Sequence, residues 1–117
     1  MTALSRDAIL AARDCRREAV RVPEWGGTVF VKVMSGADRD AFEQSVQDRR
    51  ALGKVGENMR ALVVVHSVVD DAGKQLFTEA DLDALGAKNY LALDRIVNAA
   101  LRLNKLNDEQ LEADIKN

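Results

Sequence analysis

Few residues in this sequence are of the types that carry out chemistry. The chain has one histidine, His66, and one cysteine, Cys15. A nucleophilic thiol needs a base or cation that lowers its pKa, and a metal site needs further ligands at fixed spacing. The sequence contains no H-x-x-H, C-x-x-C or H-x-x-x-E pattern. We therefore expect His66 to be a hydrogen-bonded residue of the core or its boundary, and Cys15 to pack as a small apolar side chain.

Acidic side chains gather between Asp70 and Asp81, as they do in calcium-binding loops. In that motif a carboxylate occupies position 1, a glycine position 6 and a glutamate position 12. If Gly73 is placed at position 6, Glu79 falls at position 12, but Val68 falls at position 1. The leading ligand is missing, so we interpret the segment as a polar turn followed by a capped helix.

Nucleotide and phosphate motifs are also incomplete. The stretch from Gly53 to Gly56 lacks the remaining residues of a P-loop, and Gly26 and Gly27 do not open a βαβ unit. No serine lies in a nucleophile elbow. We therefore predict no enzymatic activity, no cofactor and no bound metal.

Length and charge limit the remaining classes of protein. The 117 residues suit one domain, and 47% of them are hydrophobic, which is enough for a core. The net charge of −2, with no long basic run, argues against nucleic-acid binding, and no apolar run approaches the length that spans a membrane. We expect a single globular domain over residues 1–106, a loosely ordered tail over residues 107–117, and a cytoplasmic location.

The N-terminal segment predicts a helix. Ser5 is a favourable N-cap, and Ala8, Ile9, Ala12 and Cys15 recur at helical spacing. We expect this helix to extend from residue 5 to residue 18 and to bury that stripe.

The pattern then changes to the alternation of a β-hairpin. Residues 18–22 and 28–34 alternate valine with other residues, which predicts two strands, and the intervening Pro-Glu-Trp-Gly-Gly sequence predicts a five-residue loop. A lone two-stranded hairpin is marginal in water. This one must therefore lean on a helix or on another chain.

Three further segments predict helices: residues 35–52, 78–86 and 88–105. Ser35 and Thr78 each stand three residues before an aspartate, as in a capping box. The third segment carries apolar residues on one face and polar residues on the other.

The most apolar stretch, residues 59–69, allows two interpretations. Its five β-branched valines favour a strand, whereas the absence of strict alternation and the presence of two apolar stripes favour a buried helix. We predict the helix, followed by a turn at residues 70–73 and a short extended stretch at residues 75–77. The predicted fold is α+β and mainly α-helical, with a small β-hairpin near the N-terminus packed on a bundle of about four to five helices.

A protein without a chemical site acts through contacts, and Trp25 is the first candidate for one. An aromatic side chain at a loop tip is costly to leave in water, and tryptophan is enriched among interface hot spots. The alternative is that Trp25 folds back onto the helices of its own domain. The apolar faces of the helices at residues 59–69 and 89–106 are further candidates. The predicted partner-binding residues are therefore Trp25, Phe30, Val64, Val68, Ile96 and Leu103.

The order of these segments resembles that of the tail assembly chaperones of long-tailed bacteriophages. The hairpin over residues 20–34, with its Pro-Glu-Trp-Gly-Gly turn, is followed by the helix start Gly-Ala-Asp-Arg-Asp-Ala-Phe-Glu at residues 36–43. The stretch Leu-Phe-Thr-Glu-Ala-Asp-Leu at residues 76–82 and the Leu-Asn-Lys-Leu-Asn end of the last helix are also similar to that family's pattern. The resemblance covers about residues 18–107.

The resemblance implies a non-enzymatic assembly role. Such chaperones are thought to coat the tape measure protein and to help recruit the tail tube protein. The exposed edge of the predicted hairpin would also allow a homo-oligomer or a ring. The implied location is the host cell cytoplasm, with the protein absent from the mature virion. The alternative is a structural tail or head–tail connector component of the virion, which would remain in purified particles.

Overall fold

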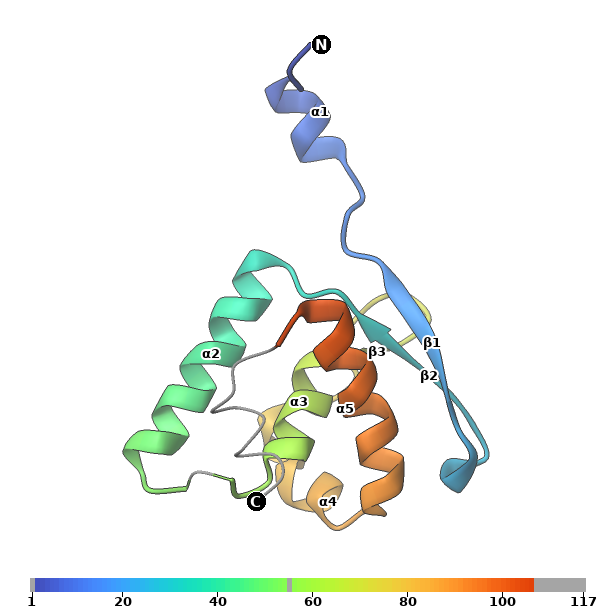
Figure 1. Ribbon diagram of the computed structural model, residues 1–117, viewed down its shortest axis with the longest axis vertical. Helices are drawn as coiled ribbons and strands as arrows, with labels where there is room; N and C mark the ends of the chain where they lie inside the picture. The colour runs from blue at the N-terminus through green and yellow to red at the C-terminus, as the bar shows by residue number, and fades with distance from the viewer. Residues whose placement is uncertain (1, 55, 107–117) are drawn as a thin grey trace.

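A three-stranded antiparallel sheet lies against a group of helices, and a separate short helix projects from one end (Figure 1). The computed structural model describes residues 2–54 and 56–106. The α+β, mainly helical class is as predicted. In chain order the elements are α1 (Arg6–Ala11), β1 (Arg17–Val22), the 3-10 turn η1 (Pro23–Trp25), β2 (Gly27–Lys32), α2 (Gly36–Ala51), α3 (Met59–Ser67), β3 (Val68–Val69), the 3-10 turn η2 (Glu79–Asp81), α4 (Leu82–Gly86) and α5 (Tyr90–Asn104).

The predicted hairpin is confirmed. Strands β1 and β2 pair from Arg17 opposite Lys32 to Val22 opposite Gly27. Gly26 adopts a left-handed conformation with φ of 71°, which glycine adopts without steric cost and which closes the turn. The connection is one residue shorter than predicted, because Gly27 already pairs with Val22.

The prediction of one unbroken helix over residues 59–69 is wrong at its end. Helix α3 ends at Ser67, and Val68 and Val69 form β3, which pairs with Val31 and Phe30 of β2. The valine-rich stretch is therefore helical up to Ser67 and forms a strand at Val68 and Val69. The third strand also supplies the support that a two-stranded hairpin lacks.

Helix α3 lies at the centre of the core. Met59 and all residues from Ala61 to Ser67 are buried, so both apolar stripes of this helix are covered. Helix α5 packs on one side of it and also contacts β1 and β2. The sheet, α4 and α2 enclose the remaining sides (Figure 1).

The N-terminal helix differs from its prediction. Ser5 caps it as expected, through a hydrogen bond from the Ala8 N–H to Ser5 Oγ at 3.1 Å, but the helix ends at Ala11 and buries no residue. Cys15 lies beyond it and is exposed rather than packed. Residues 2–15 thus form an arm that extends away from the rest of the described chain (Figure 1).

The remaining helices follow their predicted signals. Ser35 Oγ accepts the Asp38 N–H at 3.1 Å, and Thr78 and Asp81 form a complete capping box. Helix α5 begins and ends within two residues of the predicted bounds, and Lys105 terminates it in the left-handed conformation.

Candidate partner-binding surface

His66 has a structural role, as predicted. Its Nε2 lies 3.2 Å from Oε2 of Glu79, and its ring meets that of Phe42 edge to face at 5.6 Å. Ser45 Oγ donates to the same carboxylate oxygen at 2.7 Å. Because Ser45 and His66 both contact the carboxylate of Glu79, the cluster links α2, α3 and η2.

The polar turn at residues 70–73 is also structural. Asp70 Oδ1 accepts hydrogen bonds from the N–H groups of Ala72 and Lys74, both at 2.9 Å. These backbone hydrogen bonds lower the pKa of the Asp70 carboxyl. Within residues 2–54 and 56–106, no group of three or more His, Cys, Asp or Glu side chains is placed to hold a metal ion. In the same part of the chain, no helix is long and apolar enough to cross a membrane.

The hairpin tip carries an exposed aromatic side chain. Trp25 is 39% exposed, and with Phe77, Leu85 and Lys88 it lines an apolar hollow of about 300 Å³. The tip therefore faces the start of α5 and α4 without being fully covered by them. The side chain of Trp25 is thus partly buried against its own domain and partly exposed to solvent, and its role in partner binding stays a prediction.

An ion pair fixes the tip against α5. Arg95 donates from Nε and Nη2 to the two carboxylate oxygens of Glu24, at 2.8 and 3.0 Å. The Arg95 hydrogen bond holds the pKa of Glu24 below its usual range. A bidentate pair restricts orientation as well as distance, so it positions the adjacent Trp25.

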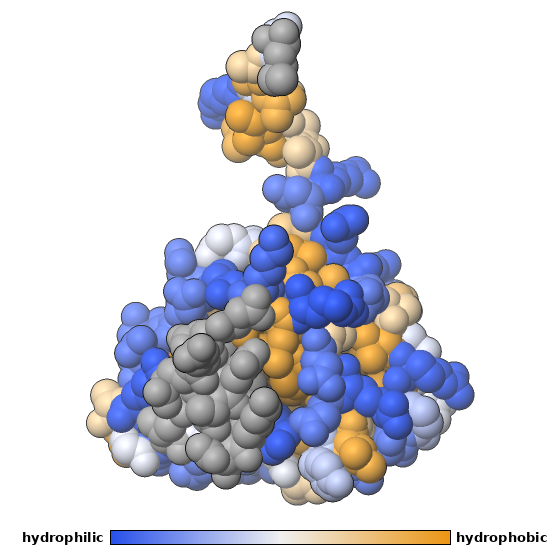
Figure 2. Space-filling view, viewed as in Figure 1, coloured by the Kyte–Doolittle hydropathy of each residue, from blue (hydrophilic) through white to orange (hydrophobic). Residues whose placement is uncertain are grey.

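A second group of exposed apolar side chains lies on the arm. Leu4, Ile9 and Leu10 are 74%, 55% and 67% exposed, and no residue of α1 is buried. Figure 2 shows hydrophobic surface, drawn in orange, on the arm, which projects away from the rest of the described chain. Isolated helices this short are marginal in water, so α1 is suited to dock on another surface.

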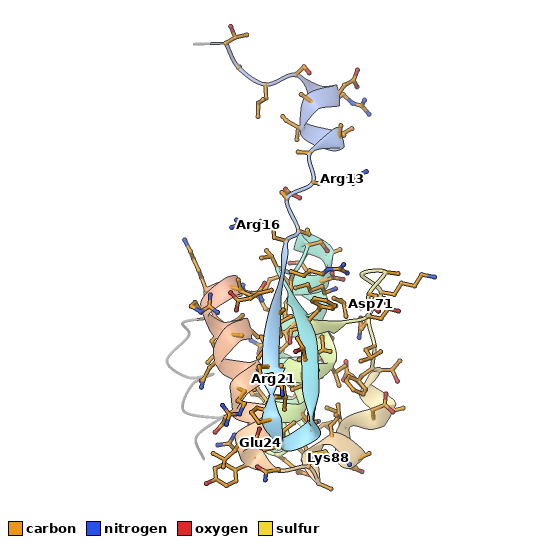
Figure 3. All side chains as sticks on the ribbon, turned by 90° about the vertical axis from the view of Figure 1, so that its right-hand side faces the viewer. Arg13, Arg16, Arg21, Glu24, Asp71 and Lys88 are labelled. Carbon is orange, nitrogen blue, oxygen red and sulfur yellow. The ribbon has the colours of Figure 1, made fainter. Side chains whose placement is uncertain are left out.

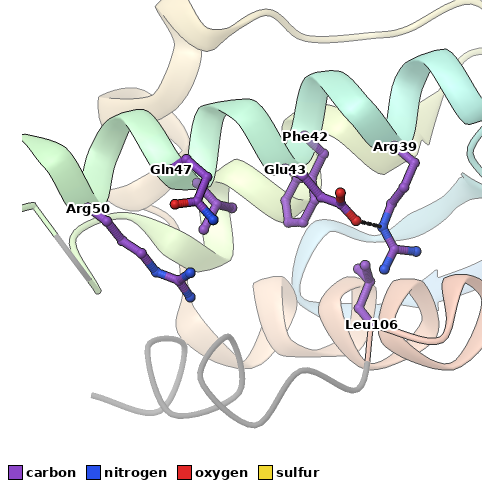
Figure 4. A pocket seen from close by; sticks show the side chains of 7 residues that line it. Arg39, Phe42, Glu43, Gln47, Arg50 and Leu106 are labelled. Atoms are coloured by element: carbon purple, nitrogen blue, oxygen red, sulfur yellow. Dashed lines mark hydrogen bonds and ion pairs between the residues drawn. The ribbon is translucent and has the colours of Figure 1, made fainter.

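A hollow of about 270 Å³ separates α2 from the end of α5 (Figure 4). Phe42 and Leu106 form its apolar floor, while Arg39, Glu43 and Arg50 line its rim. Glu43 Oε1 accepts from Arg39 Nε at 2.9 Å. This surface combines apolar and charged groups, unlike the hollow at the hairpin tip.

The structure divides the predicted partner-binding residues. Val64, Val68 and Ile96 are 0%, 1% and 0% exposed. Val64 and Ile96 lie in the core where α3 and α5 pack on one another, and Val68 is buried in β3, so the three do not form an exposed face of this chain. Phe30 and Leu103 are half-buried, and Trp25 is the one member of the set with substantial exposure.

Within the described part of the chain, the exposed large apolar residues outside the predicted set are Leu4, Ile9, Leu10, Leu52, Leu76, Tyr90 and Leu91. Ile9 is outside the predicted set because it belongs to the helical stripe that was expected to be buried, and no pattern in the sequence pointed to Leu4 or Leu10. The sequence does carry an indication that this helix face stays exposed. Its other residues, Ala8, Ala12 and Cys15, are small and offer little area to bury.

Comparisons with known proteins agree with this description. The family model of the phage tail assembly chaperone matches residues 4–115. Among solved structures, the chain is similar to the tail assembly chaperone of bacteriophage HK97, with 21% identity, a TM-score of 0.55, and coverage of 83% of this chain and 90% of that one. A search of curated proteins found no match. Because the family model spans nearly the whole sequence, the chain belongs to the phage tail assembly chaperone family.

Proposed function

We propose that this chain binds the tape measure protein of its phage and helps to recruit the tail tube protein while the tail is assembled. It does so without catalysis, in the host cytoplasm, and it leaves before the virion is complete. The structural likeness supports the fold, and the family supports a role in tail assembly. The identity of the partners is the content of the proposal.

The observation that carries the proposal is the placement of exposed apolar side chains at two separate sites. One is the arm, with Leu4, Ile9 and Leu10, and the other is the hairpin tip around Trp25. Exposed apolar surfaces bind other polypeptides by removing the same area from water. Two such sites on one small chain allow it to hold two polypeptides, or two parts of one, at the same time.

The arm also supports self-association, as in an oligomer or ring. A short helix at the end of an extended linker, Ala12–Arg16, is able to reach a neighbouring copy while its own domain stays folded. Light scattering over a range of concentrations tests this part of the proposal. A constant monomer mass would contradict it and leave the client-binding part standing.

Co-expression tests the client-binding part. The tape measure protein and the tail tube protein are each produced with and without the full chain, and complexes are recovered through an affinity tag on the client. The proposal predicts a recovered complex with the tape measure protein and a larger soluble fraction of that client. Absence of association at micromolar concentrations, with both partners soluble, would contradict it.

Purified virions distinguish the assembly role from a structural one. A chaperone is absent from finished particles, whereas a tail or connector component remains in them. Mass spectrometry of purified particles supports the proposal if peptides of this chain are missing and contradicts it if they occur in stoichiometric amounts.

A further inference from the structure

The outer edge of β1 has no partner in the described chain. The strand order is β1-β2-β3, so β1 pairs with β2 on one side only. The Val33 N–H donates to the Arg16 carbonyl at 2.7 Å, and residues 16 and 33 continue the register in which Arg17 lies opposite Lys32. Because such pairs alternate along an antiparallel ladder, the N–H and C=O groups of Arg17, Ala19 and Arg21 point to the open edge.

Exposed arginines lie on β1 and on the segment that leads into it. Arg13, Arg16 and Arg21 are exposed, and no carboxylate of residues 2–54 and 56–106 lies within ion-pair distance of them. Figure 3 looks onto the hairpin and shows the three along the arm and the first strand. Nearby, the side chains of Arg95 and Arg102 are already engaged by Glu24 and Glu18.

We propose that the open edge of β1 binds an acidic, extended segment of a client protein as a fourth strand of the sheet. The backbone groups at Arg17, Ala19 and Arg21 supply the hydrogen bonds, and Arg13, Arg16 and Arg21 supply the charge. This inference rests on the proposed function, because it names the kind of client segment that the chaperone takes.

The charge pattern favours such a client over a second copy of the chain. If two β1 edges paired antiparallel about Ala19, Arg17 of each copy would face Arg21 of the other. Like charges directly opposite one another destabilise a strand pair. An acidic segment converts the same positions into favourable pairs.

The pattern also favours a polypeptide over a nucleic acid. The open edge offers backbone hydrogen bonds that match another strand. Asp70 and Asp71, with Leu76, line the hollow beside Phe30 toward the β3 edge of the sheet, where phosphates would be repelled.

Proline substitutions test the edge itself. Ala19→Pro removes an N–H that faces solvent in the free protein, a position where an edge strand tolerates proline, so the fold should survive. Thr28→Pro is the matched control: Thr28 lies opposite Arg21, and its N–H points away from β1. Circular dichroism and the melting temperature of both variants establish that each is folded.

Binding is measured by fluorescence anisotropy with overlapping labelled peptides that cover the tape measure and tail tube proteins of the phage. The wild-type chain should bind a subset rich in Asp and Glu. Ala19→Pro should weaken that binding by about tenfold, as expected for lost main-chain hydrogen bonds, while Thr28→Pro leaves it unchanged. In the complex, the amides of Ala19 and Arg21 should gain protection from hydrogen exchange.

Charge is tested with the triple variant R13A/R16A/R21A and the control K54A/K74A/K105A, which removes three exposed lysines that lie outside both β1 and the hollow at Trp25. The triple variant should bind more weakly and lose most of the salt dependence, and the control should retain both. Equal binding by the wild type, Ala19→Pro and the triple variant would overturn the inference while leaving the proposed function intact.

Three other outcomes would also overturn the inference. If the wild type bound no peptide, the inference would fail, whereas the proposed function fails only if the whole tape measure protein also does not associate in the co-expression experiment. Self-association lost in Ala19→Pro, with client binding kept, would assign the edge to a second copy. Binding of an oligonucleotide in place of the acidic peptides would assign the arginines to phosphate.

Discussion

The side chain of Asn104 accepts a hydrogen bond from the backbone N–H of Met34 through Oδ1, at 2.7 Å. Its Nδ2 donates to the carbonyls of Lys32 and Ala100, both at 3.1 Å. The Asn104 carbonyl in turn accepts from Arg39 at 2.8 Å. Asn104, a buried residue at the end of α5, thus forms hydrogen bonds with the backbone of Lys32 and Met34, where the chain leaves β2. Its carbonyl also links it to Arg39 at the start of α2.

The first prediction concerns the hydrogen bonds of the Asn104 side chain. Asn104→Ala leaves the buried Met34 N–H without an acceptor, which costs about 1–3 kcal/mol of unfolding free energy. Asn98→Ala, at an exposed position of the same helix, should change stability by less than about 0.5 kcal/mol. Urea denaturation of both variants measures the difference. Equal stability of the two would mean that water replaces the asparagine amide.

The second prediction concerns pH. The Lys32 Nζ lies 2.6 Å from Asp38 Oδ2, and this hydrogen bond lowers the pKa of Asp38. A carboxyl whose pKa is lower in the folded state contributes stability above its unfolded pKa of about 4, and that stability is lost as pH falls through the folded value.

Asp38→Asn should therefore lower the melting temperature at pH 7 and change it little at pH 2. Asp40→Asn, at an exposed position of the same helix, is the control. A melting-temperature difference between wild type and Asp38→Asn that is the same at both pH values would show that the ion pair contributes no pH-dependent stability.

The third prediction concerns the arm. Because α1 buries none of its residues, a variant with Leu4, Ile9 and Leu10 all changed to serine should keep the melting temperature of the wild type within about 2 °C. The same variant should lose association with the client or with other copies. Calorimetry and light scattering measure the two properties, and a large drop in melting temperature would place the arm in the folded core.

The fourth prediction concerns Trp25. Since its side chain is 39% exposed, Trp25→Ala should weaken client binding more than it lowers stability. Tyr90→Ala, at a 62% exposed position near the start of α5, serves as the comparison for loss of an exposed aromatic side chain. A Trp25→Ala variant with a large loss of folded signal and unchanged client affinity would assign the residue to the core.

The sequence predicted those elements whose signals are local. The caps at Ser35 and Thr78 each depend on a few neighbouring residues, and the structure has both. The two hairpin strands follow from the same kind of signal, but their register differs by one residue from the predicted five-residue loop, because Gly27 pairs with Val22. The apolar stripe of α5 was long enough to fix its period.

Elements that depend on tertiary contacts were harder to predict. An apolar stripe does not say whether it faces the core or solvent, so Val64 and Ile96 were expected at an interface and lie in the core. The apolar stripe of the N-terminal segment was expected to be buried and is exposed. Asn104 falls four residues after Ala100 on the buried face of α5. A polar residue at that position indicates a buried side chain that needs hydrogen-bond partners.

The central claim is that this chaperone binds the tape measure protein through exposed apolar surface. Isothermal titration of the full chain with soluble tape measure protein at several temperatures tests it most directly. Binding should show a negative heat-capacity change, and the change should shrink in the arm variant and in Trp25→Ala. No association at micromolar concentration, or association with no heat-capacity change in any variant, would contradict the claim.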